Sequence, residues 1–123
     1  MALTKNAYIL VSNQTIAASG TYISPSSLDL SGAINLEVVF KGTFNSSSSA
    51  GAKVEMFSDP TNSSFTVGTN DEPIDSMDIS KVTGAKSKPA QFKCSSRYVK
   101  FKVTNLGNQS ITGCYVYAVT QTQ

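Results

Sequence analysis

The sequence predicts an all-β fold, a single antiparallel β-sandwich or jelly roll of about eight strands. Apolar and polar residues alternate repeatedly along the 123 residues, and no stretch places apolar residues at helical spacing. Clusters of Gly, Pro, Ser, Asn and Asp separate the alternating runs, as expected of turns. Charged residues make up 15% of the chain, below the roughly 25% typical of soluble domains, and 19 Ser and 12 Thr take their place.

Alternation is clearest in the first half of the chain over residues 34–41, followed by the shorter run 52–56. Side chains two residues apart share one face of a strand, so each run has one apolar face for a core. In the first run that face consists of Ile34, Leu36, Val38 and Phe40. The expected strands, in chain order, are residues 7–11, 20–23, 34–41, 52–56, 65–67, 74–79, 91–94, 97–103 and 114–119.

Turns or loops are expected between these strands, wherever Gly, Pro, Asn or Asp cluster. A chain of this length fits one domain, residues 1–123, and we expect residues 1–6 to form an N-terminal arm. The segments expected as turns or loops are residues 24–27, 42–51, 58–62, 70–73, 84–89 and 105–108.

Residues 97–103 predict a strand with a basic outer face. Val99, Phe101 and Val103 would point inward, and Tyr98, Lys100 and Lys102 would point outward beside Arg97. A tyrosine among bases is a pattern of single-strand nucleic-acid binders. We favour an exposed sheet face whose long side chains cover apolar surface, and expect no nucleic-acid partner.

Residues 114–119 are apolar on both faces of the expected strand, which predicts a strand that is central or covered by a neighbour. Tyr115 and Tyr117 share the face opposite Cys114 and Val116. Two tyrosines in register suit a protein interface, because tyrosine buries a large area at low entropic cost. They would also fit a second part of the core, and the sequence favours neither position over the other.

The residue types in the sequence give little support for catalysis. The chain has no His and no Trp, which excludes a catalytic triad of the usual kind. Two cysteines, Cys94 and Cys114, cannot complete a tetrahedral zinc site without histidine. Both lie on expected strands, so we expect buried free thiols, with a bridge between them as the alternative. No glycine-rich loop follows a strand. We therefore expect a protein that is not an enzyme and needs no cofactor or metal.

Four acids, Asp71, Glu72, Asp75 and Asp78, gather within eight residues. Two facing carboxylates could hydrolyse a glycosidic bond, and several oxygens from one loop could bind calcium. A polar loop followed by the solvent face of an edge strand is the simpler interpretation, and we prefer it.

Charge is unevenly distributed along the chain. Residues 1–78 hold all eight acids and three of the ten bases, and residues 79–123 hold the other seven bases. A solvated basic face explains this, as does a docking surface for an acidic partner. The opening residues lack a signal-peptide pattern and no run is long enough to span a bilayer, so we expect cytoplasmic synthesis and no membrane partner.

Two stretches of the chain resemble a known class of proteins. Residues 17–42 contain SGTY and LDLSG, and residues 95–119 contain RYVK followed by VTN and a closing strand. This layout resembles small β-sandwich or jelly-roll virion proteins of tailed bacteriophages, of the capsid decoration and head-fibre type.

The resemblance implies a virion protein that binds and stabilises the head shell. Its partners would be the major capsid protein or other virion proteins, and it would form a homo-oligomer, first expected as a trimer. The interface residues would be Arg97, Tyr98, Lys100, Lys102, Tyr115 and Tyr117. Two alternatives remain: a neck, tail or baseplate component, and a carbohydrate-binding module for host attachment, because discoidin-like sandwiches have a similar RYV…VTN strand.

Overall fold

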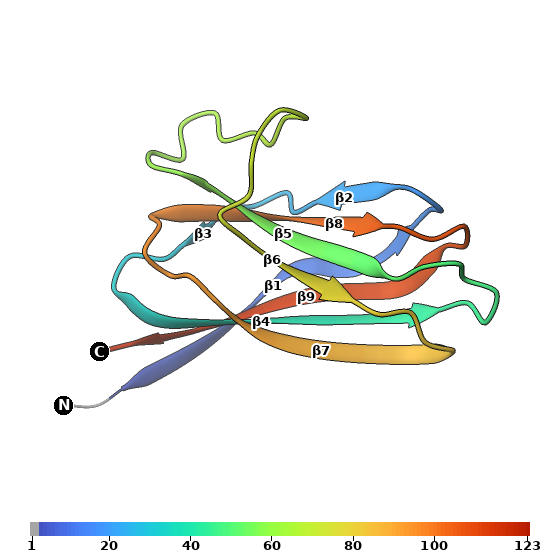
Figure 1. The fold of residues 1–123 in the computed structure, drawn as a ribbon. Helices are drawn as coiled ribbons and strands as arrows, with labels where there is room; N and C mark the ends of the chain where they lie inside the picture. Colours follow the sequence, from blue (N-terminus) through green and yellow to red (C-terminus); the bar gives the residue numbers. More distant parts are fainter. Residues whose placement is uncertain (1–2) are drawn as a thin grey trace.

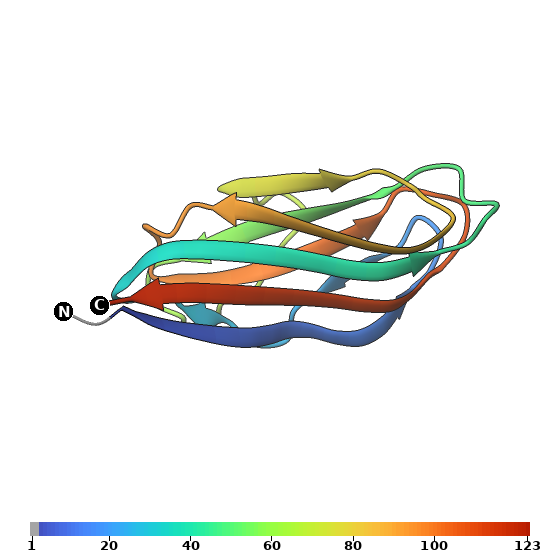
Figure 2. The ribbon, with the colours of Figure 1, turned by 90° about the horizontal axis from the view of Figure 1, so that it is seen from below.

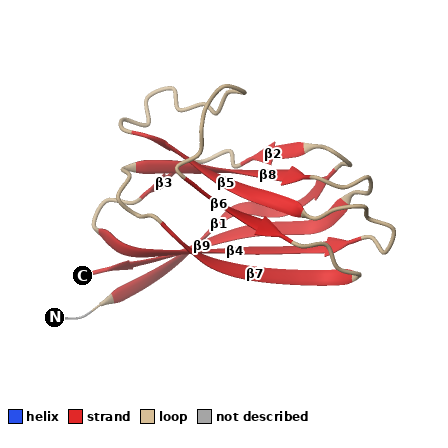
Figure 3. Cartoon of the chain, in the orientation of Figure 1, coloured by secondary structure: helices blue, strands red, loops and turns tan. Residues whose placement is uncertain are grey.

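The computed structural model describes residues 3–123, which form strands and loops without a helix (Figure 3). The strands lie in two antiparallel sheets. Sheet A has the order β1-β9-β4-β7, and sheet B has the order β2-β8-β5-β6, with β3 also paired to β8. The strands are β1 (Thr4–Ile16), β2 (Thr21–Ile23), β3 (Leu28–Asp29), β4 (Ala33–Phe44), β5 (Ala52–Asp59), β6 (Asp75–Ile79), β7 (Gly84–Phe92), β8 (Tyr98–Asn105) and β9 (Ile111–Thr122).

The two sheets lie face to face in a sandwich, with the C-terminus and the first described residues at the same end (Figures 1 and 2). Strands from the two halves of the chain pair in a nested series: β1 with β9, β2 and β3 with β8, β4 with β7, and β5 with β6. Such a series is one long antiparallel ribbon rolled into two sheets, which is the jelly roll expected from the sequence. β2 and β3 act as two pieces of one edge strand.

The alternation of apolar and polar residues along the strands explains which side chains form the core. The inner residues of both sheets form one cluster of buried side chains, with Phe40 and Phe101 among the largest that are fully enclosed. On β8, Val99, Phe101 and Val103 are fully buried, while the residues between them are half-buried on the outer face, as predicted. β9 lies between β1 and β4, so its prediction as a central strand is confirmed.

Several local predictions are wrong. Residues 42–44 and 58–59, expected in loops, are the ends of β4 and β5. Residues 65–67 are not a strand but part of the loop between β5 and β6. Residues 84–89, expected as a loop, belong to β7, where Pro89 is tolerated because β7 is an edge strand of sheet A. Ile34 does not join the buried face of β4; it is 44% exposed at a register shift in the pairing of β4 with β9.

The expected N-terminal arm also differs from the structure. Thr4, Lys5 and Asn6 are the first residues of β1 and pair with Thr122, Gln121 and Thr120 of β9. Residues 1–2 of that arm lie outside the described residues. The start of the described chain is therefore an edge of sheet A.

Candidate interaction surfaces

Tyr115 and Tyr117 lie on the outer face of sheet A. Their neighbours Cys114, Val116 and Ala118 are fully buried, so alternation turns both tyrosines away from the core, where they are half-buried. The two rings are stacked, with centroids 5.6 Å apart and planes 11° from parallel. The structure contradicts the core interpretation of this pair, because neither ring belongs to the core cluster, and the interface interpretation stays a prediction.

An apolar band runs across sheet A beside these rings. Tyr117 is paired with Ile9 of β1 on one side and with Val39 of β4 on the other. Directly paired residues share a face of the sheet, so Ile9 and Val39 lie on the outer face as well. Ile9 is 58% exposed. We call Ile9, Val39, Tyr115 and Tyr117 the tyrosine face.

A basic margin borders the tyrosine face. The ammonium of Lys41 lies 5.9 Å from the centroid of Tyr117, within range of a cation–π contact. A shallow hollow of about 510 Å³ is lined by both tyrosines and by Lys41, Thr43, Lys86 and Ser87, among others. The surface thus combines aromatic area with nearby positive charge.

The four residues expected to share this interface lie on the opposite side of the molecule. Arg97 precedes β8, and Tyr98, Lys100 and Lys102 lie on the outer face of β8 in sheet B. The structure therefore divides the six predicted interface residues between two outer faces, which one flat partner surface cannot contact together.

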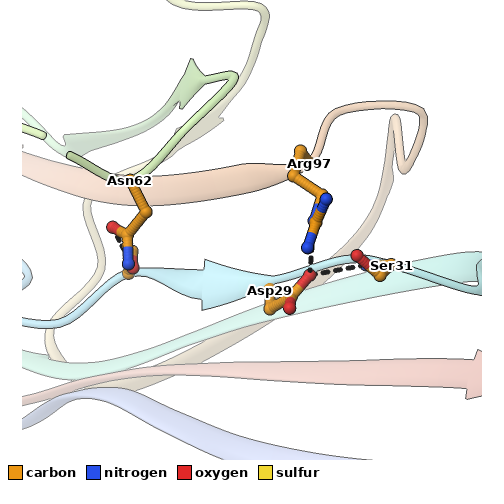
Figure 4. A network of polar contacts seen from close by, with 5 residues as sticks. Asp29, Ser31, Asn62 and Arg97 are labelled. Carbon is orange, nitrogen blue, oxygen red and sulfur yellow. Dashed lines mark hydrogen bonds and ion pairs between the residues drawn. The ribbon is translucent and has the colours of Figure 1, made fainter.

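Several groups on sheet B are already occupied within the chain. Arg97 Nε lies 3.5 Å from Asp29 Oδ1, and its guanidinium carbon lies 4.9 Å from the Tyr98 ring centroid. The pKa of Asp29 is lowered, mainly by hydrogen bonds from Ser31, and the positive charge of Arg97 lowers it further (Figure 4). The ion pair fastens β3 to the start of β8.

Lys100 is also held by an internal contact. Its ammonium donates a 2.9 Å hydrogen bond to the carbonyl of Phe65 and lies 5.4 Å from the centroid of that ring. Phe65 and Phe57 are buried, but neither belongs to the main core. The loop of residues 60–74 therefore packs over the outer face of sheet B and covers part of the basic surface (Figure 1).

The second half of the chain does not present its positive charge on one face. Lys88 pairs with the buried Phe40 and so points toward the inside of the sandwich, where its ammonium donates a hydrogen bond to the carbonyl of Asp78. Lys81 donates to the carbonyl of Ser48. Lys100 and Lys102 face the other side of the molecule. An acidic partner would meet these bases only in separate groups.

The acidic segment makes local hydrogen bonds. Asp71 accepts a 2.6 Å bond from the N–H of Gly68, and Asp75 accepts one of 2.8 Å from the N–H of Lys93. Within residues 3–123 no group of three or more His, Cys, Asp or Glu side chains is arranged to hold a metal. The arrangement of these carboxylates therefore gives no support to the calcium site considered from the sequence.

Both cysteines are free thiols in the structure, as expected. Cys114 is fully buried in the core, and burial raises the pKa of its thiol from 9.0 to about 12. Cys94 is half-buried. Among the described residues, no helix is both long and apolar enough to cross a membrane.

Comparisons with known proteins identify the fold alone. No family model matches the chain, and no curated protein matches it. Among solved structures, a chain from Bacillus endospore appendages, described as disulfide-linked pili, aligns with a TM-score of 0.52 at 13% identity, over 98% of this chain and 88% of that one.

Two further solved structures are similar. Latent PorU from Porphyromonas gingivalis aligns with a TM-score of 0.55 at 10% identity over the whole of this chain, which corresponds to 13% of PorU. The mitogen of Yersinia pseudotuberculosis aligns with a TM-score of 0.44 at 16% identity, over 98% of this chain and 85% of that one. The similarity to the endospore-appendage chain and to PorU supports an all-β sandwich and carries no function by itself.

Proposed function

We propose that this chain is a structural subunit that works by docking onto a larger protein assembly, and that the assembly is the head of a tailed phage, which the chain decorates and stabilises. The observation that carries the proposal is the tyrosine face, an apolar and aromatic surface on the outside of a rigid sandwich. Tyrosine is enriched in protein interfaces, where it supplies much of the binding energy.

The fold is consistent with this function. Jelly rolls occur in viral capsid proteins, and a structure described as a pilus has a similar fold. Both are fold-level analogies, and they favour a building block over a small-molecule site. The partner would be the major capsid protein or another virion protein, and a neck, tail or baseplate position would use the same surface.

A stable complex requires the docking contact to bury enough surface area. A standard protein interface buries roughly 1,600 Å² in total and depends on a few well-packed aromatic or Arg residues. The tyrosine face supplies two aromatic rings that are already stacked against each other. Because each ring restricts the other, less side-chain freedom is lost on docking.

A binding assay tests the proposal. Purified protein is mixed with heads of the virus that carries the gene, stripped of the protein, and the bound fraction is measured by cosedimentation. The double variant Tyr115→Ser/Tyr117→Ser should bind roughly tenfold or more weakly, because both aromatic anchors are lost.

The matched control is Tyr98→Ser on the opposite sheet, which should bind like the original chain. Failure of the unaltered protein to bind heads would refute the decoration role. Equal losses in the control and in the double variant would refute the assignment of the surface.

A carbohydrate-binding module is the second candidate, favoured by the shallow hollow that the two tyrosines line together with Thr43 and Ser87. Sugars stack on open aromatic faces, and here each tyrosine turns one face toward the other. This arrangement leaves less open ring surface, so we rank glycan binding lower. Glycan-array binding that is lost in Tyr117→Ala would reverse the ranking.

A further inference from the structure

Three of the four sheet edges in this sandwich carry features that oppose pairing with another strand. β7 contains Pro89, and Lys86 and Lys88 point inward from it. The edge made by β2 and β3 is interrupted at residues 24–27, and β6 has five residues. Proline, inward charges, interruptions and short length are the usual means by which edge strands avoid association.

The remaining edge, β1, is protected over only half of its length. Its pairing with β9 shifts register between Ile9 and Val11 and at two later points, and Asn13 there has a φ of 48°. Such bulges disrupt a strand as a template for pairing. From Thr4 to Ile9, however, six consecutive residues pair with β9 in unbroken register.

This regular segment is open to solvent along its whole length. Each residue from Thr4 to Ile9 is exposed, and β1 lies along one side of the molecule with no strand beyond it (Figure 2). Ile9 and Tyr8 are 58% and 41% exposed, and Lys5 is the segment's one charged residue. An edge strand turns every second pair of backbone N–H and C=O groups outward, so this segment offers unpaired hydrogen-bonding groups beside apolar side chains.

We propose that this segment pairs antiparallel with the same segment of a second copy, so that two copies of sheet A join into one continuous sheet across a two-fold axis. The other three sheet edges of the second copy are poor partners for this segment, because each carries one of the protective features described above. Pairing of this segment with a different edge would give head-to-tail chains, and such pairing is therefore disfavoured. The inference depends on the edge of β1 alone, and holds or fails independently of the decoration role.

Charge limits the register of this pairing. An antiparallel pair of identical strands has its two-fold axis perpendicular to the sheet, so one residue must lie opposite its own copy. Centring the axis on Lys5 would oppose two like charges, which is unfavourable. Centring it on Asn6 places Lys5 opposite Ala7, and centring it on Ala7 places Lys5 opposite Ile9. Both of these registers leave the lysine without a like-charged neighbour.

The pairing would extend the tyrosine face. Because the axis is perpendicular to the sheet, both copies turn the outer face of sheet A in the same direction. Ile9, which pairs with Tyr117 within each copy, would then lie near the junction. The dimer would present two tyrosine pairs on one surface. This two-fold contact does not build the trimer that we first expected from the sequence.

One substitution tests both allowed registers. Ala7→Lys places its lysine opposite Lys5 when the axis is centred on Asn6, and opposite its own copy when it is centred on Ala7. Sedimentation equilibrium of the full chain should show a dimer for the original protein and a dissociation constant raised roughly tenfold for the variant. Ser76→Lys adds the same charge to an exposed position of β6 in sheet B, opposite Glu55, and should leave the dimer unchanged.

Hydrogen exchange gives an independent measurement. In the original protein, outward-facing amides between Thr4 and Ile9 should become slower to exchange as the protein concentration rises, and in Ala7→Lys they should stay fast. Circular dichroism and thermal unfolding check that both variants fold. A monomer at all concentrations, a trimer, or an Ala7→Lys variant that dimerises like Ser76→Lys would overturn the proposal. So would protection of this edge that appears only when a different protein is added.

Discussion

Asn105 joins the end of β8 to two other parts of the chain. Its fully buried amide donates hydrogen bonds to the carbonyls of Ile16, Ala17 and Gln109, and its oxygen accepts one from the N–H of Gly107. These bonds satisfy backbone groups where β1 ends and where the turn before β9 begins. A buried polar side chain of this kind helps to fix both turns, because it satisfies backbone groups from each of them.

Replacing this residue should be costly. Asn105→Ala removes the side-chain hydrogen bonds to these backbone groups, and we expect a loss of roughly 2–4 kcal/mol in the free energy of unfolding. Urea denaturation measures it. Asn35→Ala is the control, because Asn35 makes an exposed hydrogen bond of 3.1 Å with Gln121. That control should cost at most about 0.5 kcal/mol, and similar losses in both variants would contradict this view of Asn105.

At the scale of elements, the loop of residues 60–74 is a separate layer on sheet B. Phe65 of this loop is buried, as is Phe57 of β5, and neither side chain belongs to the main core. The loop is held by Lys100 and by the 2.7 Å bond from the Ser27 hydroxyl to Asn62 Oδ1. Few buried contacts hold it compared with the strands. We therefore expect it to open without unfolding the sandwich.

Limited proteolysis checks this expectation. Phe65→Ala removes the buried ring, so cleavage between residues 60 and 73 should become roughly tenfold faster because the loop opens more often. The free energy of unfolding should change by less than about 1 kcal/mol, because the ring lies outside the main core. Thr66→Ala, at the exposed next position, should be cut at the original rate. Unchanged cleavage of Phe65→Ala, or its global destabilisation, would contradict a separately held loop.

β7 shows why some elements could not be predicted. Gly84, two inward lysines and Pro89 have the composition of a loop, and only the edge position in sheet A makes them compatible with a strand. That position depends on pairing with β4, whose residues lie at least 40 positions earlier in the chain than their partners. The alternating strands β5 and β8 were predictable because their local pattern alone separates a buried face from an outer one.

At the scale of the whole molecule, the candidate site was likewise predictable where it depended on the pattern along one strand, and unpredictable where it depended on how distant strands pair. The outward direction of Tyr98, Lys100 and Lys102 followed from alternation along one strand. Their separation from Tyr115 and Tyr117 did not, because it depends on β8 and β9 joining different sheets. The open edge at Thr4–Ile9 was missed for a similar reason, since a strand is an edge only with respect to its neighbours. Its exposed Ile9 was the available signal.

The whole molecule is thus a rolled ribbon with a covered side and an open side. A loop packs over sheet B, while sheet A leaves its tyrosine face and half of β1 uncovered. The proposed docking role therefore predicts that binding partners contact sheet A before sheet B.

Electron cryo-microscopy of the native particle tests this claim most directly, because it reveals the partner, the symmetry and the buried face together. The account predicts jelly-roll density on the particle, with the outer face of sheet A against neighbouring subunits and Tyr115 and Tyr117 buried in the contact. Particles without this protein, or a contact made through sheet B with both tyrosines facing solvent, would contradict it.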